Sequence, residues 1–218
     1  MTNSELIIQN WGSGVEYQSA WDRQRELHHK IVTENHPDVA VLLEHQNVYT
    51  AGRSTKPEDR PTDSSPVFDI DRGGRITWHG PGQIVCYPIM KLDDPVDVVA
   101  HVRRLELLIM NVCSKVGLET TQIEGRSGVW VKGNGLPDKK IAAIGIRVAK
   151  KATMHGFALN VNANLGYFDN IIPCGIKGKA VTSMHVELGR AIDENEVKEK
   201  IVKHFQILFE ALFFTSEI

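Results

Sequence analysis

Cysteine is scarce in this chain, and the three cysteines do not form a pattern that predicts a disulfide or a metal site. Cys86, Cys113 and Cys174 are far apart, odd in number and without a CxxC pair, which argues against a disulfide framework. The nine histidines are scattered, and no set of Cys and His has the spacing of zinc ligands. We therefore expect no metal, and each cysteine should be either a packed thiol or a reactive one.

Long apolar runs and a surplus of charge are also missing. No stretch reaches the roughly 18 apolar residues of a membrane span, and the first residues do not resemble a signal peptide. The 25 Lys and Arg nearly balance the 27 Asp and Glu, for a net charge of −2, whereas nucleic-acid-binding domains are usually clearly basic. We expect a cytoplasmic protein that binds neither membranes nor nucleic acids.

The sequence does contain enough apolar residues for a core, because they make up 42% of its 218 residues. A chain of this length usually forms one domain, so we expect 1–218 to be a single domain. Helical spacing of apolar residues predicts helices over 16–34, 96–116 and 193–214. Short apolar or β-branched segments predict strands over 39–43, 67–70, 75–79, 84–90, 128–132, 141–148 and 153–161. Because the strands cluster between helices, the pattern predicts an α+β fold with mixed β-sheets flanked by helices.

A glycine-rich segment, RGGRITWHGPGQ at 72–83, is the first place where chemistry could occur. It combines four glycines with Arg, Thr, His and Gln, and glycine lets a backbone approach a ligand closely. The segment matches neither a phosphate-binding P-loop nor a dinucleotide fingerprint. We favour a binding loop over a plain turn.

Two predicted strands carry polar groups beside small residues. Lys139 and Lys140 precede the apolar segment 141–145, and HGFALN occupies 155–160. The residues alone favour ordinary interpretations, namely an exposed lysine at a strand end and tight packing between strands.

The last candidate is Cys174, which lies between Pro173 and Gly175 in a predicted loop, where a thiol is accessible. Cys86 in a strand and Cys113 in a helix instead look like small packed hydrophobic residues. The residues alone leave a structural role for Cys174 open.

Taken together and in this order, RGGRITWHGPGQ, a lysine before IAAIG, HGFALN and PCGI resemble the motifs of the lipoyl(octanoyl) transferases. The resemblance extends over most of the chain, from 44 to 189. It implies the fold of biotin/lipoyl ligase catalytic domains, with one acyltransferase catalytic domain over 1–218. It also implies transfer of an octanoyl group from acyl carrier protein to a lysine of lipoyl domains, as the first step of lipoate synthesis.

The same resemblance assigns roles by position. The family nucleophile falls on Cys174, and the lysine that lowers the pKa of this thiol falls on Lys140. The acyl-substrate site falls on Arg72, Gly73, Gly74, Arg75, Ile76, Thr77, Trp78, His79, Ala143, Ile144, Gly145, Gly156, Phe157 and Ala158. The segment 132–138 is longer than in the shortest family members, so the choice of Lys140 over Lys139 depends on alignment from the strand side.

Partners and cofactors follow from the resemblance as well. Octanoyl-acyl carrier protein would be the donor, and the acceptors would be lipoyl domains of 2-oxoacid dehydrogenases and the glycine cleavage H protein. A thioester donor is already activated, so we expect no cofactor, and we expect a monomer. Basic residues near the motifs, such as Lys150 and Lys151, are candidates for docking acidic partners, although an ordinary solvated mixture of charges is equally open.

Two other functions remain open at this point. An ATP-dependent lipoate– or biotin–protein ligase shares the fold, forms an acyl-adenylate and needs no cysteine nucleophile. A non-catalytic module that binds acyl groups or lipoyl domains is the third possibility. A requirement for ATP would identify the ligase, and a complete lack of turnover would identify the binding module.

Overall fold

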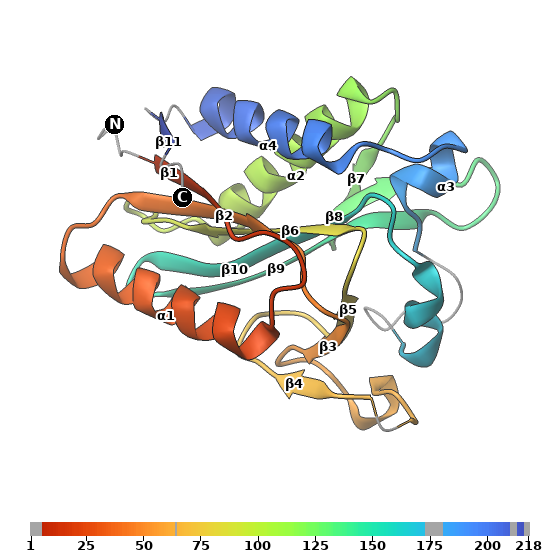
Figure 1. The fold of residues 1–218 in the computed structure, drawn as a ribbon, viewed down its shortest axis with the longest axis horizontal. Coiled ribbons are helices and arrows are strands. Elements are labelled where there is room, and N and C mark those ends of the chain that lie inside the picture. The colour runs from red at the N-terminus through yellow and green to blue at the C-terminus, as the bar shows by residue number, and fades with distance from the viewer. Residues whose placement is uncertain (1–5, 64, 173–180, 210–212, 216–218) are drawn as a thin grey trace.

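The computed structural model describes residues 6–63, 65–172, 181–209 and 213–215, which form two β-sheets and the helices around them (Figure 1). The larger sheet has eight strands in the order β11-β1-β2-β6-β10-β9-β8-β7. Its strands are β1 (Leu6–Asn10), β2 (Asp38–Leu43), β6 (Gln83–Ile89), β7 (Thr121–Ile123), β8 (Arg126–Val131), β9 (Lys139–Ala149), β10 (Ala152–Asn160) and β11 (Phe213–Thr215). The smaller sheet has the order β4-β3-β5, with β3 (Val48–Ala51), β4 (Val67–Asp69) and β5 (Thr77–His79).

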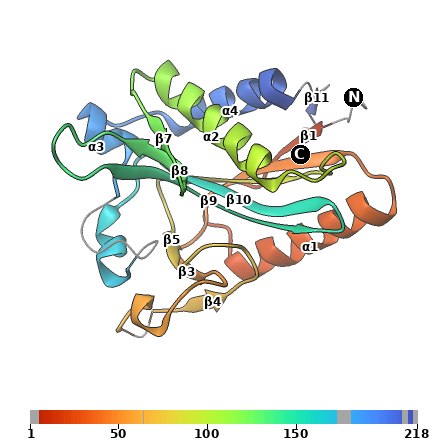
Figure 2. The same cartoon turned by 180° about the vertical axis from the view of Figure 1, so that it is seen from behind.

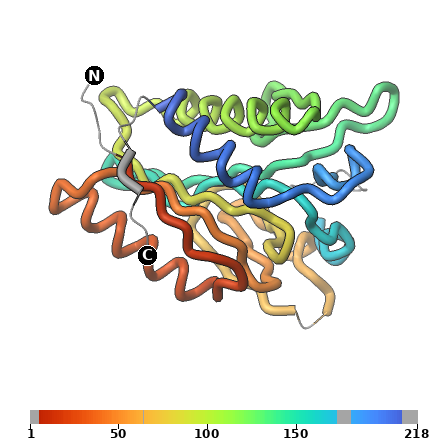
Figure 3. Tube along the Cα trace, turned by 45° about the horizontal axis from the view of Figure 1, so that its top comes forward, coloured from red at the N-terminus to blue at the C-terminus, as the bar shows by residue number. Residues whose placement is uncertain are grey.

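Helices cover both faces of the larger sheet. The helices are α1 (Tyr17–Thr33), α2 (Val98–Lys115), α3 (Met184–Leu188) and α4 (Glu194–Phe209), with 3-10 turns η1 (Pro57–Asp59) and η2 (Leu165–Asn170). Figures 2 and 3 show α2 and α4 side by side on one face, while α1 lies on the opposite face together with the smaller sheet. Each face therefore buries its own apolar layer.

Alternation along the central strands separates these two layers, because successive side chains of a strand point to opposite faces. Ile84 and Cys86 of β6 pack in the core under α2 and α4. Val85 and Tyr87 of the same strand pack in the core beside α1. The strands are buried on both faces, which explains their almost continuous apolar sequences.

The predicted α+β fold is confirmed, since the sheets contain parallel pairs such as β1–β2 and antiparallel pairs such as β9–β10. The predicted helices over 16–34 and 96–116 correspond to α1 and α2. The helix predicted over 193–214 is wrong at its end, because α4 stops at Phe209 and 213–215 form β11. Phe213 pairs with Leu6 of β1, and this non-local partner is invisible to a helical periodicity.

Some short elements were not expected from the sequence, including β1, β3, β7 and α3. Three to five residues give too little periodicity to be recognised, and the three strands among them are stabilised by pairing with a neighbouring strand instead. Among the described residues, no helix is long and apolar enough to cross a membrane.

Candidate active site

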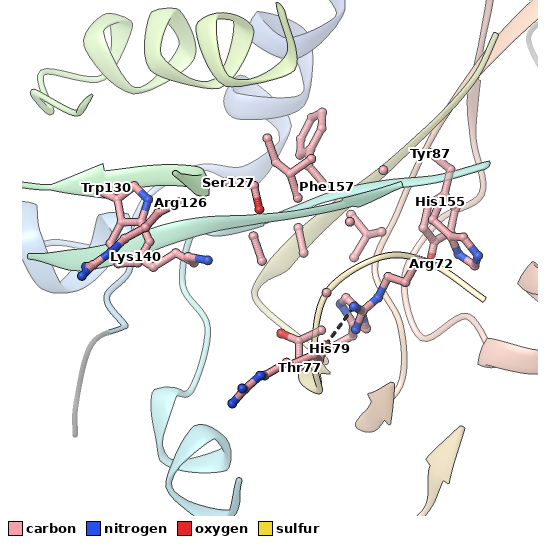
Figure 4. Close-up of a pocket in the computed structure, with 18 of the residues that line it drawn as sticks. Arg72, Thr77, His79, Tyr87, Arg126, Ser127, Trp130, Lys140, His155 and Phe157 are labelled. Carbon is pink, nitrogen blue, oxygen red and sulfur yellow. Dashed lines mark hydrogen bonds between the residues drawn. The ribbon is translucent and has the colours of Figure 1, made fainter. Parts of the chain in front are cut away.

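A cavity of about 310 Å³ lies on the α1 side of β6, β9 and β10, next to the smaller sheet (Figure 4). Its volume falls within the range of small-molecule sites. Most of the predicted site residues line it, namely Arg72, Gly74, Arg75, Thr77, His79, Lys140, Ala143, Ile144, Gly145, Gly156, Phe157 and Ala158. Three of the four sequence motifs, which are far apart in the chain, thus line one cavity. The fourth, PCGI at 173–176, lies outside the described residues.

Three of the predicted site residues that the structure describes, Gly73, Ile76 and Trp78, do not line this cavity. Ile76 and Trp78 pack in a separate core, where the Trp78 ring stacks on Tyr167 at 5.0 Å between centroids. Gly73 is not a lining residue, and its N–H donates to the carbonyl of Ile146. Cys174 falls within 173–180, outside the described residues.

The cavity distinguishes the two adjacent lysines. Lys140 lines the cavity, is only 9% exposed, and has its Nζ 4.7 Å from the centroid of the Trp130 ring. The side chain of Lys139 is 35% exposed and points to the other side of the strand, where its Nζ donates to Glu187 Oε1 at 2.6 Å. Figure 4 shows Lys140, Trp130 and Arg126 gathered at one end of the cavity.

Arg72 reaches the opposite end of the cavity, near His155 and Tyr87 (Figure 4). Its guanidinium donates to the carbonyls of Gly73 and Arg75 and to both oxygens of Thr50. A Cβ on Gly145 would lie 2.8 Å from Arg72 Cδ. Glycine at 145 therefore makes room for the arginine side chain, which fixes the guanidinium against the sheet.

The second motif glycine in the sheet has a different neighbour. A Cβ on Gly156 would lie 2.1 Å from the carbonyl oxygen of Cys86. Gly156 thus permits a close approach between β10 and β6. Neither of the two glycines opens empty space by itself. Ala158 of β10 also lines the cavity and presents a small side chain to it.

Two buried histidines beside the cavity are neutral. Burial lowers the pKa of His45 to about 4 and, together with the nearby His45, lowers the pKa of His79 to about 3. His45 Nδ1 lies 2.9 Å from the carbonyl of Val15, which can only accept, so this nitrogen carries the proton. His45 Nε2 is then an acceptor, and the Tyr87 hydroxyl donates to it at 2.6 Å.

The same logic orients a chain of hydrogen bonds from the cavity. Arg72 donates to Thr50 Oγ1, and the Thr50 hydroxyl donates to His79 Nε2 at 3.2 Å. His79 Nδ1 donates to Gln83 Oε1 at 2.7 Å, and the Gln83 amide donates to Asn160 at 2.9 Å. Each donor and acceptor has a defined direction, and such networks rigidify a site when they are fully satisfied.

This series of hydrogen bonds ends at Thr182, which lies just after the undescribed residues 173–180. Asn160 Nδ2 donates to the carbonyl of Thr182 at 2.9 Å, and the Thr182 N–H donates to the carbonyl of Lys140 at 2.9 Å. Val181 forms a parallel bridge with Lys140. Val181 and Thr182 are therefore anchored directly beside the cavity lysine.

His155 is a strained residue on the cavity wall. Its φ of 60° is unusual for a residue other than glycine, and its side chain is buried. Its Nε2 lies 2.8 Å from Asp71 Oδ1, and Asp71 also pairs with Arg147. The hydrogen bond from His155 holds the pKa of Asp71 below its usual range. Strain of this kind persists where surrounding contacts enforce it, often at functional sites.

The site residues predicted from the sequence omit several residues that line the cavity, namely Tyr17, Val85, Tyr87, Gly125, Arg126, Ser127, Trp130 and His155. Tyr17 begins α1 and Tyr87 lies mid-strand, so both looked like ordinary core residues. His155 was visible as the first residue of HGFALN. The described residues contain no group of three or more His, Cys, Asp or Glu placed to hold a metal ion.

Lys150 and Lys151 lie far from Lys140. They form the turn between β9 and β10, and the ten residues that separate Lys150 from Lys140 span about 33 Å of strand. Lys151 pairs with Asp94 at that end of the sheet. Their distance argues against a docking role beside the cavity lysine.

Comparison with known proteins identifies relatives that match nearly the full length of the chain. Residues 16–206 match the family model of the lipoyl protein ligase A/B catalytic domain. An octanoyltransferase of Salinispora arenicola is 51% identical over 211 residues, which cover 96% of this chain and 99% of that protein. An octanoyltransferase of Streptomyces coelicolor is 48% identical, with 95% of this chain and 94% of that protein covered.

Solved structures agree on the fold. A bipartite lipoate protein ligase of Thermoplasma acidophilum superposes with a TM-score of 0.73 at 13% identity, covering 99% of this chain and 88% of that one. A biotin protein ligase of Aquifex aeolicus has a TM-score of 0.54 at 15% identity, covering 95% and 73%. The chain therefore belongs to the lipoyl protein ligase A/B catalytic-domain family, and within it to the octanoyltransferases.

Proposed function

We propose that this enzyme transfers an octanoyl group from octanoyl-acyl carrier protein to a lysine of lipoyl domains, and that Cys174 carries the group as a thioester between the two steps. The observation that supports this proposal best is the cavity, which brings the glycine-rich segment, Lys140 and HGFALN together. About half of the residues are identical to those of curated octanoyltransferases over nearly the full length. The cysteine of PCGI is the nucleophile in this proposal.

In the first step, the Cys174 thiolate attacks the donor carbonyl and expels the phosphopantetheine thiolate of the carrier, so one thioester replaces another. A free thiol with a pKa near 8.5 is only about 3% ionised at pH 7. The Lys140 ammonium favours the thiolate by its positive charge. The first described residue after 173–180 supports this pairing, because Val181 forms a parallel β-bridge with Lys140.

In the second step, the amine of the acceptor lysine attacks the acyl-enzyme, forms an amide and releases the Cys174 thiol. The acceptor ammonium must first lose a proton, and Lys140 is the group that we propose to mediate this transfer. Formation and breakdown of an acyl-enzyme is a double displacement, so ping-pong kinetics are expected.

The cavity offers an apolar wall for the acyl chain. Val85 and Ala158 face it from β6 and β10, and Ala143 faces it from β9. Burial of the seven methylene and methyl groups beyond the carbonyl is worth roughly 5–6 kcal/mol at about 0.8 kcal/mol per group. The free energy of chain burial is therefore large enough to select a medium-length acyl group.

The acceptors in this proposal are lipoyl domains of 2-oxoacid dehydrogenases and the glycine cleavage H protein, and the enzyme acts as a cytoplasmic monomer. The related Thermoplasma ligase is described together with its E2 lipoyl domain, which supports a lipoyl domain as the acceptor class. An ATP-dependent ligase is the second candidate, because the solved ligases share this fold.

A turnover experiment separates the candidates. Purified enzyme is mixed with octanoyl-acyl carrier protein and an unmodified lipoyl domain, with and without ATP and magnesium, and the lipoyl domain is weighed by mass spectrometry. We expect octanoylation at the same rate in both mixtures and parallel lines in double-reciprocal plots. Octanoylation that requires ATP would identify a ligase, and a lack of octanoylation under both conditions would refute the proposal.

A further inference from the structure

The cavity-facing residues of β9 do not follow the alternation of a regular strand. Ala143 and Gly145 line the cavity, as residues two apart should, whereas Ile144 between them borders the cavity but packs in the core under α2 and α4. Lys140 lines it as well, although residues three apart in a regular strand point to opposite faces. The alternation must therefore be reset between Lys140 and Ala143.

The reset occurs at Ile141. Ala142 of β9 pairs with Val129 of β8, but Lys140 pairs with the next residue, Trp130. Ile141 thus has no partner on β8, which is the pattern of a β-bulge. Ile141 and Ala142 also pack in the same core under α2 and α4, although they are consecutive. The bulge places Lys140 on the cavity face, whereas a regular strand would direct it into the apolar core.

Gly128 of β8 lies against the bulge and needs to be glycine. Its φ is +108°, and a Cβ there would lie 2.4 Å from the carbonyl oxygen of Ala142. The same Cβ would lie 3.3 Å from Lys140 Cε. The stem of the Lys140 side chain therefore occupies the space that a side chain at 128 would need.

Glu106 of α2 fixes the backbone of Gly128. Its side chain is completely buried, and its Oε1 accepts the Gly128 N–H at 2.8 Å. Its Oε2 accepts a hydrogen bond from Arg103 at 2.5 Å. A carboxylate that is buried, paired and bonded to a backbone N–H forms a strong and directional hydrogen bond.

We infer that Glu106 is a positioning residue for Lys140. It anchors Gly128, Gly128 holds β8 against the bulge at Ile141, and the bulge directs the Lys140 ammonium over the Trp130 ring into the cavity. This inference rests on the proposed function, because the consequence of a displaced ammonium is read at the thiol of Cys174. It concerns a residue that touches neither the acyl group nor the thiol.

The test measures the ionisation of the Cys174 thiol in the full-length enzyme. The rate of single alkylation by iodoacetamide is followed between pH 5.5 and 9.5 by intact mass, for the wild type, Lys140→Ala, Glu106→Ala and Glu106→Gln. We expect Lys140→Ala and Glu106→Ala to raise the pH at which the alkylation rate reaches half of its maximum, which we call the midpoint. If the thiol pKa moves from about 6.5 to about 7.5, the alkylation rate falls about threefold at pH 7 and stays nearly unchanged at pH 9.5. Glu106→Gln retains an acceptor for the Gly128 N–H, so its midpoint should stay close to that of the wild type.

A matched control separates positioning from general destabilisation. Asp38 of β2 is also a buried carboxylate that accepts a backbone N–H, from Lys91 at 2.9 Å, and it does not line the cavity. Asp38→Ala should leave the midpoint of the alkylation rate unchanged, whatever its effect on the melting temperature. If Glu106→Ala does not fold, Glu106→Met fills a similar volume without an acceptor and provides the same comparison.

The outcomes distinguish this inference from the proposed function. A midpoint that Lys140→Ala leaves unchanged would refute the role of the lysine, and the positioning inference with it. If Lys140→Ala moves the midpoint while Glu106→Ala or Glu106→Met does not, the inference alone is wrong. Equal shifts for Glu106→Ala and Glu106→Gln would also overturn it, because the hydrogen bond to Gly128 would then be irrelevant.

Discussion

Replacement of Lys140 with alanine removes the ammonium that the cavity holds over Trp130, and its effect on acylation can be worked out. A unit charge about 4 Å from a thiolate is worth up to about 4 kcal/mol near a protein surface. A pKa shift of two units corresponds to about 2.7 kcal/mol, so one lysine is sufficient. With a thiol pKa near 6.5, about 75% of Cys174 would be thiolate at pH 7, compared with about 3% at a pKa near 8.5.

We therefore expect Lys140→Ala to slow the first step about 25-fold at pH 7. The sign of the pH dependence follows from the same reasoning. A lower thiol pKa gives an advantage only below the ordinary pKa, so the difference should shrink as the pH rises and nearly vanish around pH 9.5. The assay is rapid-quench mass spectrometry of the acyl-enzyme at saturating octanoyl-acyl carrier protein, from pH 6 to 9.5.

Lys139→Ala is the matched control, because it removes the neighbouring ammonium from the other side of the strand. The partly exposed Lys139–Glu187 pair should contribute at most about 1 kcal/mol to stability, and the rate of acylation should remain unchanged. Equal losses for Lys139→Ala and Lys140→Ala would refute the reasoning. So would a Lys140→Ala defect that is as large at pH 9.5 as at pH 7.

Three further predictions concern other parts of the chain. Burial raises the pKa of Asp38 to about 6, so the stability it contributes is present below pH 3.8 and is lost as the pH rises through 6. In urea titrations, Asp38→Asn should match the wild type near pH 3.5 and exceed it by about 3 kcal/mol at pH 8; equal stability at pH 8 would contradict this. Burial also raises the pKa of the other two cysteines, to about 12 for one of them, so native enzyme should take up one alkyl group and Cys174→Ser none, as read by intact mass. Gly145→Ala should push against Arg72 and cost about 1–3 kcal/mol of stability with a higher KM, and an unchanged Tm and KM would refute the packing argument.

The sequence was sufficient for features that local patterns determine. The apolar stripe of α2 and its boundary near Asp97 could be read directly, because an amphipathic helix repeats every 3.6 residues. The buried strands β6 and β10 were also visible as short apolar or β-branched segments. Cys86 and Cys113 were correctly predicted to be packed, since both are buried.

Features that depend on the neighbouring strand could not be read. The β-bulge at Ile141 arises from the pairing of β8 with β9, so the orientation of Lys140 was not visible in its own segment. The strand β11 depends on the edge of β1 in the same way. Trp78 lies within a binding motif, yet it packs in a core because the alternation of β5 directs it away from the cavity.

The tyrosines at the Arg72 end of the cavity were not predicted from the sequence, for a related reason. Tyr17 and Tyr87 come from segments that are far apart in the sequence, and their hydroxyl groups become relevant only after α1 packs on the sheet. The glycines were recognised, but their partners were not. Gly145 accommodates the Arg72 side chain and Gly156 accommodates β6, whereas composition alone suggested an open trough.

The central claim is that Cys174 carries the octanoyl group, and one measurement tests it most directly. Enzyme is incubated with octanoyl-acyl carrier protein in the absence of ATP, and its intact mass and peptide masses are determined. We predict one octanoyl group on Cys174, lost when an unmodified lipoyl domain is added and never formed by Cys174→Ser. A wild-type enzyme that turns over without acquiring this group, or a Cys174→Ser variant that still acquires it, would contradict the account.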